Sequence, residues 1–546
     1  MNDLKIWIRK IPLHVWILLL IVAVGIFLRT YHFRDWLVFN PDQARDATVI
    51  GNILEGKKSW LMLGPEAGNT LFDLGPWFYH LEAISAKIFG NAPDKLAYPD
   101  LLFSILAIPL FYIFLKKYFK RNLSLLLTFF LSISYFMIFY SRFASNPNSI
   151  PFFSLLFFLG LLMLLDSKEK RVAWGAALAG IGIGVGLQLH ILILFVMPAV
   201  VFLFFLNLFL RKAPIAPLVK KTLMILFFAL IANIGQIAYE ANHNHSNTNR
   251  FLKAFSKNAQ SNNWGQDIEI TLLCQAEANL HILASTSTGD NCEYPAVLSR
   301  ILASRVIGVP LGQADRDILL EIAVGLLFTL GGYVLLVYFW RVETDPAKKR
   351  FLALVGAYAA VTFFVMVPII GQAALRYYIV IFFLPFVFLG LWTKLLWGGR
   401  NGKEKYFFGA ALIAIFALIA YLQYVKIGSE YTKHKEMSFS DTRFVALDEA
   451  EVMAKYVAEN TLPQKKAYIS GKVVFFSRYF KPVSYLAKKQ YGIKIERGLK
   501  ESKMKDDIPM FFFKKPVSAY QIKSRIIMGR EAKGYKMFNN VAIVKF

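Results

Sequence analysis

The sequence predicts a polytopic α-helical membrane protein that ends in a small soluble α/β domain. Of the 546 residues, 56% are hydrophobic and 16% are aromatic, which is more apolar than a soluble chain of this length would be. The chain contains about eleven apolar runs, and a run of roughly 18 or more residues can cross a bilayer as a helix. After residue 427 the composition becomes charged and typical of a soluble domain.

The apolar runs fill most of the first 427 residues. The first run is long and lacks a small-residue cleavage site, so we expect a retained span and not a signal peptide. No internal repeat is evident that would indicate inverted halves. The predicted spans are residues 11–30, 98–115, 122–140, 148–165, 172–188, 190–210, 222–239, 318–340, 351–370, 377–397 and 406–425.

Basic residues gather in every second connection between these runs. The positive-inside rule then places the N-terminus in the cytoplasm, and an odd number of spans places the C-terminus outside. The same loops explain the net charge of +26. Because no basic–aromatic nucleic-acid motif is present, we do not expect nucleic acid as a partner. The basic clusters are Lys5, Arg9 and Lys10; Lys116, Lys117, Lys120 and Arg121; Lys168, Lys170 and Arg171; Arg211, Lys212, Lys220 and Lys221; Arg341, Lys348, Lys349 and Arg350; and Arg400, Lys403 and Lys405.

The first predicted external connection, residues 31–97, contains two helix signals. The segment FNPDQARDA begins one helix, because Asn40 is a typical N-cap and Gln43 has the spacing of a capping box. Asp42 falls in the first turn, where free N–H groups and the helix dipole stabilise a carboxylate. A second helix is predicted in LFDLGPWFYHLEAISAKIFG, residues 71–90. We expect both helices to lie along the membrane surface with their apolar faces inward.

The other two large connections are also predicted to be external. Residues 241–317 are polar, with one helix expected near residues 249–257. Cys274 and Cys292 both lie there, and in an oxidising compartment they are candidates for a disulfide, with two free thiols as the alternative. The tail, residues 428–546, should form a small α/β domain. Its expected elements are a helix at 448–460, strands at 466–470 and 508–513, and a hairpin at 535–546 about Asn539 and Asn540. It shows no catalytic motif, so we expect it to support the protein or recognise a partner.

The polar residues that stand out all fall on the predicted external side, which indicates a cavity at the membrane surface. There a carboxylate could remove a proton from an acceptor hydroxyl or amine, and arginine could hold a phosphate with paired hydrogen bonds. These candidate residues are Asp42, Asp46, Asp73, His80, Glu82, Arg142, Asn146, Gln188, His190, Glu240, Arg376 and Tyr377.

The order of the motifs NPDQARDA, LGPWFYHLEA, SRFASNPN, LQLHI and RYYI over roughly residues 10–425 resembles the GT-C glycosyltransferases. It is most similar to the family 39 group of bacterial polyprenyl-phosphate-sugar transferases, related to the protein O-mannosyltransferases and the lipid A aminoarabinose transferase. The resemblance implies an enzyme of the bacterial inner (plasma) membrane that performs an inverting sugar transfer on the external face. Its partners would be a polyprenyl-phosphate sugar donor, membrane lipid, and a glycan, lipid or protein acceptor.

Within this resemblance, the family's aspartate after the first span matches Asp42, the expected base. Asp46 lies one turn later and either shares the site or only tunes Asp42. Arg376, with Arg142, would hold the donor phosphate. Where the aminoarabinose transferase has Lys-Pro-Pro, this chain has residues 73–76, DLGP, which leaves the donor sugar and the acceptor open.

Each assignment has a plainer alternative. Asp42 and Asp73 could simply cap helices, Arg45 could form only a local ion pair with Asp42, and the other arginines could snorkel at helix ends. Some GT-C enzymes use a divalent metal, but the HNHSN run at 243–247 lacks a proper ligand set, so the metal question stays open. A transporter or flippase is the main functional alternative, followed by a non-catalytic scaffold.

Overall fold

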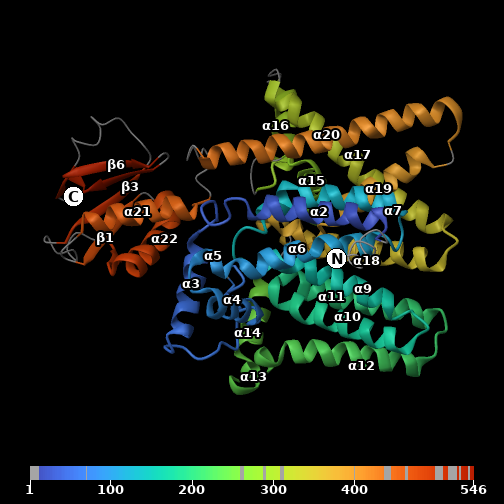
Figure 1. Ribbon diagram of the computed structural model, residues 1–546, viewed down its shortest axis with the longest axis horizontal. Helices are drawn as coiled ribbons and strands as arrows, with labels where there is room; N and C mark the ends of the chain where they lie inside the picture. Colours follow the sequence, from blue (N-terminus) through green and yellow to red (C-terminus); the bar gives the residue numbers. More distant parts are fainter. Residues whose placement is uncertain are drawn as a thin grey trace, which may run out of the picture.

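A computed structural model gives the architecture of the chain (Figure 1). It describes residues 11–68, 70–258, 263–286, 291–307, 313–398, 400–435, 444–461, 465–471, 473–498, 508–514, 526–527, 530–538 and 541–546. The predicted fold class is confirmed: the chain consists of a bundle of long apolar helices, a group of surface helices and a small C-terminal sheet. It is an integral membrane protein.

Within the described ranges, nine helices are long and apolar enough to span a membrane, and a pair bent by 62° makes a tenth. The shorter apolar helix α7 (Arg121–Ile133) occupies the position of the remaining predicted segment. The nine are α2 (Leu13–Thr30), α6 (Tyr98–Leu115), η1 with α9 (Asn146–Ser149 and Ile150–Met163), α10 (Glu169–Leu189), α11 (Ile191–Leu210), α12 (Ile215–Ala232), α17 (Gln313–Val342), α18 (Pro346–Met366) with η2 (Val367–Gln372), and α20 (Gly402–Lys435); the bent pair is η3 (Leu375–Ile381) and α19 (Leu384–Trp397).

Two of the predicted spans are interrupted. The helix expected at 122–140 breaks at Ser134, whose hydroxyl donates to the carbonyl of Ile282, and α8 (Tyr135–Phe139) follows. The helix expected at 222–239 ends at Ala232. Asn233 then donates from its side chain to Gly184 O at 2.9 Å, and α13 (Ile234–Asn242) begins. Both breaks occur where a polar side chain bonds the backbone of a neighbouring helix, which hydropathy does not reveal.

Glycine allows a close helix contact in the bundle. A Cβ added to Gly160 of α9 would lie 2.4 Å from the backbone nitrogen of Ala179 in α10, so only glycine fits at this crossing. Small residues let helix backbones approach closely in a membrane, where packing and not water exclusion holds helices together.

The first large connection folds as predicted into surface helices. These are α3 (Pro41–Leu54) and α4 (Trp77–Phe89), followed by the short α5 (Pro93–Leu96). They lie at the same end of the bundle as the C-terminal domain (Figure 1). The helix α3 begins at the predicted position, after Asn40.

The second large connection differs from the prediction of a mostly irregular loop, which is wrong. Besides the expected helix, α14 (Ser246–Asn258), it contains α15 (Trp264–Ala284) and α16 (Tyr294–Ile307). Most of α15 is buried, and its polar side chains are satisfied inside: Gln275 donates to the Tyr333 hydroxyl, and Asn279 donates to the Thr329 hydroxyl. The mixture of polar and apolar residues hid the helix from hydropathy. Cys274 of α15 forms a disulfide with Cys292, just before α16.

The C-terminal domain has the predicted α/β character. Its five-stranded sheet has the order β2-β1-β3-β7-β6, in which β1 is parallel to β2 and β3, and β7 is antiparallel to β3 and β6. Helices α21 (Leu447–Glu459) and α22 (Val473–Tyr491) pack together beside it; α22 was not predicted. Residues 539–540 of the predicted hairpin lie outside the described residues. The strands are β1 (Lys466–Gly471), β2 (Lys494–Arg497), β3 (Met510–Lys514), β6 (Gly534–Phe538) and β7 (Val541–Lys545), and β4 (Ile526–Ile527) pairs separately with β5 (Arg530–Glu531).

The domain boundary predicted after residue 427 falls inside α20, which continues to Lys435. The described chain resumes at residue 444, directly before α21.

Candidate functional site

The start of α3 forms the centre of the candidate site. Gln43 accepts a hydrogen bond from the Asn40 backbone N–H at 3.1 Å and donates to Ala144 O at 2.9 Å. The Gln43 amide therefore joins the first turn of α3 to the turn between α8 and α9. Asp42 lies in this turn with 71% of its side chain exposed, so its carboxylate is open to an incoming molecule.

Arg45 connects Asp42 to Asp46. Its Nη1 donates to Asp42 at 3.0 Å, while Nε and Nη2 donate to the two oxygens of Asp46 at 2.8 and 3.2 Å. The forked guanidinium thus holds a buried carboxylate with two bonds and an exposed one with a single bond. Of the two acids proposed from the sequence, Asp42 faces outward and Asp46 is 2% exposed.

Helix α4 covers Asp46 from the other side. The Tyr79 hydroxyl donates to Asp46 Oδ1 at 2.7 Å. Burial raises the pKa of Asp46, and the hydrogen bonds from Arg45 and Tyr79 oppose that rise. One turn along α4, Glu82 is 1% exposed, and neither of its carboxylate oxygens has a hydrogen-bond partner among the residues that the structure describes. Burial, followed by the charges of Asp46 and Asp100, raises the pKa of Glu82 well above its ordinary value.

The turn between α8 and α9 connects α3 to the ends of other spans. Asp100, at the start of α6, accepts from the Ser145 backbone N–H at 3.0 Å and from the Ser149 hydroxyl. Asn146 donates to Leu189 O at 3.3 Å, at the end of α10. Asp100 was not among the residues selected from the sequence. Its position in the first turn of an apolar span was the available signal.

His190, Tyr377 and Arg376 come together beyond this turn. The ring of His190 lies edge-on to that of Tyr377 at 5.2 Å between centroids, and Nδ1 accepts from the Leu192 N–H at 3.2 Å. Burial and the neighbouring Arg376 charge lower the pKa of His190 to about 4. Arg376 is exposed, with its guanidinium 5.7 Å from the Tyr377 ring centre. A basic side chain therefore stands beside a neutral imidazole and a phenol.

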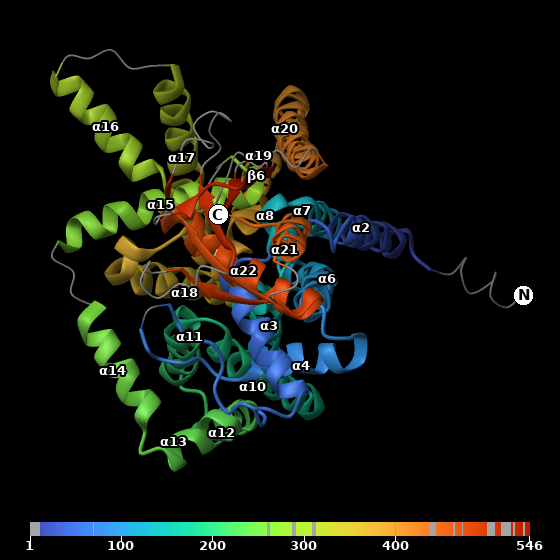
Figure 2. The same ribbon diagram turned by 90° about the vertical axis from the view of Figure 1, so that its left-hand side faces the viewer.

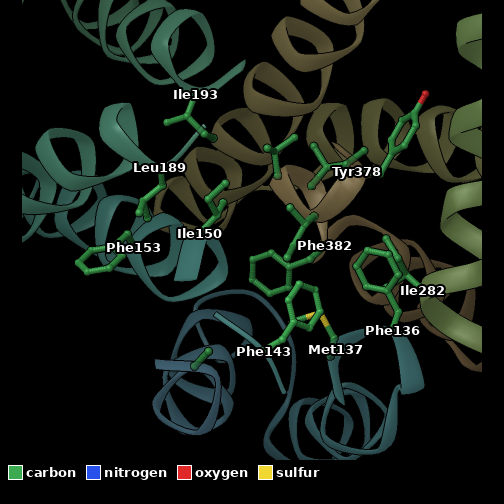
Figure 3. Close-up of a cluster of buried hydrophobic side chains, with 14 of the residues drawn as sticks. Phe136, Met137, Phe143, Ile150, Phe153, Leu189, Ile193, Ile282, Tyr378 and Phe382 are labelled. Atoms are coloured by element: carbon green, nitrogen blue, oxygen red, sulfur yellow. The ribbon is translucent and has the colours of Figure 1, made fainter. Parts of the chain in front are cut away.

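A buried apolar cluster supports these polar residues (Figure 3). It brings together Phe143, Leu189 and Tyr378, which come from three distant parts of the chain. Each of these residues lies directly beside a segment that carries candidate site residues. The cluster explains why positions about 50 and 190 residues apart in sequence meet.

Arg142 has a different environment. Its Nη1 donates to the carbonyls of Leu28 and Arg29, and its Nη2 to those of Tyr31 and His32, at 2.8 to 3.3 Å. These carbonyls belong to the last turn of α2 and the residues that follow it, where backbone acceptors lack partners within the helix. Arg142 is 7% exposed. The structure thus directs both terminal nitrogens of Arg142 to the α2 end.

Another group of predicted residues surrounds the loop before α4. The backbone of Asp73 exchanges two hydrogen bonds of 2.8 Å with the side chain of Asn247 in α14, and its carboxylate lies 3.5 Å from Arg250. Gln188 is fully buried: it accepts from the Trp77 N–H and donates to two backbone carbonyls, those of Gly184 and Ala232.

His80 and Glu240 complete the predicted set. His80 Nε2 lies 2.9 Å from Leu61 O, and Glu240 accepts from the Thr248 N–H at 3.2 Å. These contacts bind one loop to another and do not connect His80 or Glu240 to Asp42. The partners Asn247 and Arg250 were not selected from the sequence, since they lie in a polar, Asn-rich segment without a distinguishing pattern.

Across the part of the chain that the structure describes, no three His, Cys, Asp or Glu side chains are grouped in a way that could hold a metal ion.

Comparison with known proteins places this geometry in a family context. Residues 73–234 match the family model of dolichyl-phosphate-mannose-protein mannosyltransferases. This stretch includes the loop before α4, the 141–149 turn and His190, but not Asp42. No curated protein matches the sequence.

Solved structures give the fold. The oligosaccharyltransferase of Archaeoglobus fulgidus in the apo form matches with a TM-score of 0.53 and 13% identity, covering 93% of this chain and 70% of that one. ArnT from Cupriavidus metallidurans in the apo state has a TM-score of 0.49 and 12% identity, covering 100% and 98%. ArnT bound to undecaprenyl phosphate has a TM-score of 0.47 and 13% identity, covering 99% and 98%. The chain has the GT-C glycosyltransferase fold.

Proposed function

We propose that this protein is a membrane glycosyltransferase that moves a monosaccharide from a polyprenyl-phosphate donor to an acceptor on the external face. The observation that carries the proposal is the pairing of an exposed carboxylate, Asp42, with a buried Arg45–Asp46 ion pair at the start of a surface helix. The family that matches residues 73–234 takes its name from transfer of a sugar carried on a lipid phosphate, which supports the donor class.

Asp42 is the proposed base. It would accept the proton of the acceptor hydroxyl or amine as that group attacks the anomeric carbon, and the sugar–phosphate bond would break on the opposite face, so the configuration would invert. General-base assistance of this kind contributes about 10²–10⁴-fold. Arg45 holds the Asp42 carboxylate in place, and Asp46 with Tyr79 orients Arg45. Asp46 is therefore proposed as a positioning residue and not as a second base.

Arg376 is the proposed ligand of the donor phosphate. It is exposed and lies beside His190 and Tyr377. The contacts from Gln43 through Ala144, Asn146 and Leu189 reach His190, so the base and the phosphate ligand belong to one connected group. Arg142 is left out of this role, because both its terminal nitrogens bond the end of α2.

The test is a transfer assay on the purified protein in lipid vesicles with labelled polyprenyl-phosphate sugars. We expect stoichiometric release of polyprenyl phosphate and of a glycosylated product, and loss of both in Asp42→Asn. A full rate in a normally folded Asp42→Asn protein would refute the base. Movement of the lipid-linked sugar across the bilayer without transfer would instead support a flippase.

A further inference from the structure

The C-terminal domain is attached directly to the residues that precede α3. Val38 and Ala446 form an antiparallel bridge, flanked by hydrogen bonds from Phe39 N to Val445 O at 2.7 Å and from Leu447 N to Leu37 O at 2.8 Å. The two bonded segments are about 400 residues apart in sequence. They meet only a few residues before Asp42.

The N-cap side chain of α3 takes part in the same contact. Asn40 Oδ1 accepts from the Val445 N–H at 3.0 Å. Asn40 is thereby held from two sides, because its own N–H donates to Gln43. The position of the first helical turn, and with it that of Asp42, depends on residue 445.

Helix α22 of the same domain packs along α3, as seen from the end of the molecule in Figure 2. The ring of Tyr485 lies 5.6 Å from that of Phe39. Lys489 donates to the carbonyl of Asn91, between α4 and α5. The domain therefore contacts both ends of the surface-helix group and buries Phe39, which is 1% exposed.

We infer that the 444–447 segment, together with α22, positions Asp42 for catalysis. We call the Val38–Ala446 bridge and the Asn40–Val445 hydrogen bond the clamp. The C-terminal domain then contributes to the reaction without contacting either substrate. The inference rests on the proposed role of Asp42. Its physical basis is that a reacting group displaced by about 1 Å can lose about 10²-fold in rate.

Two single variants remove the same hydrogen bond from opposite sides. Val445→Pro deletes the N–H donor, and Asn40→Ala deletes the acceptor. We expect each to lower kcat by about 10- to 100-fold, with the KM for the donor unchanged, because Arg376 is not displaced. The double variant should be no worse than the more affected single variant, since both changes remove one interaction.

The matched control is Arg34→Ala. This change breaks an ion pair to Glu451 in the same interface, at 2.7 Å, whose Arg34 side chain is 51% exposed. Surface ion pairs contribute little, so kcat should stay within about twofold of wild type. Thermal unfolding of every variant shows whether the fold is retained.

A covalent clamp provides a rescue. Val38 and Ala446 form a non-hydrogen-bonded antiparallel pair, in which Cα atoms are about 4.5 Å apart, within the range for a disulfide. In the Val445→Pro background, Val38→Cys with Ala446→Cys should restore kcat when oxidised and lose it again on reduction. Wild-type protein given the same reductant controls for the Cys274–Cys292 bond.

A rescued kcat at unchanged unfolding temperature supports the clamp. Wild-type kcat in both Val445→Pro and Asn40→Ala overturns it, and so does a lowered kcat that the oxidised crosslink fails to restore. These results are separate from the base assignment. If Asp42→Asn is inactive while the clamp variants are fully active, only the clamp fails; if Asp42→Asn is fully active, the base assignment fails.

Discussion

The hydroxyl of Tyr79 donates a 2.7 Å hydrogen bond to the buried carboxylate of Asp46, joining two surface helices. The bond leaves the forked face of Asp46 to Arg45, which in turn reaches Asp42. A buried ion pair that lost one of its partners would be strongly destabilised. The helix pair α3–α4 therefore holds the proposed base through a buried network, and the predictions below address its parts.

Tyr79→Phe should lower stability and raise the pKa of Asp46 further, because that hydrogen bond favours the ionised carboxylate. A hydrogen bond to a charged group contributes about 1.5–3 kcal/mol. With its orienting contact gone, Arg45 would hold Asp42 less firmly, so kcat should fall while the KM for the donor remains. Chemical unfolding and steady-state kinetics measure the two effects; an unchanged kcat would remove Asp46 and Tyr79 from the positioning network.

Glu82→Gln should stabilise the protein increasingly as pH rises. Burial raises the pKa of Glu82 above its ordinary 4.5, so the folded state binds the proton more tightly than the unfolded state does. Wild-type stability is then complete below the ordinary pKa and decreases as pH rises toward the raised one. The glutamine side chain of the variant has no proton to lose in this range, so the difference in unfolding temperature should grow from near zero at low pH. A pH-independent difference would contradict this account.

Arg376→Ala and Arg142→Ala should differ in kind. Removing Arg376 should weaken donor binding by about 10- to 100-fold, the equivalent of about 1.5–3 kcal/mol for a charge-assisted contact, with little change in unfolding temperature. Removing Arg142 should lower the unfolding temperature, because four carbonyls at the end of α2 lose their donor. Donor titration and thermal unfolding of both variants separate the roles, and a swapped pattern would reverse them.

Loss of the disulfide should affect stability more than activity. The bond links Cys274 and Cys292 across a separation of 18 residues, far in contacts from Asp42. Closing a loop of this size is worth about 3 kcal/mol in the chain-entropy model. Cys274→Ser with Cys292→Ser should unfold at lower denaturant concentration yet keep its kcat at moderate temperature. A large loss of kcat at full folding would indicate that α15 shapes the substrate site.

The sequence by itself determined the membrane bundle, the start of α3 and the α/β character of the tail. Spans are readable because a bilayer forces each crossing segment to be a long apolar helix that satisfies its own backbone. The start of α3 is readable because capping depends on a few neighbouring residues, Asn40 and Gln43 among them. Helix α15 was missed because its polar side chains are satisfied by partners distant in sequence, which no local pattern encodes.

Only the tertiary structure distinguished residues of the same type. Arg142 and Arg376 both lie at predicted span ends, yet one bonds the carbonyls after α2 and the other is exposed beside His190. Asp42 and Asp46 lie one turn apart, yet one is exposed and the other buried beneath Tyr79. The contact of residue 445 with Asn40 joins the two ends of the chain. Burial and hydrogen bonding arise from contacts between distant segments, so they became visible only when the chain was folded.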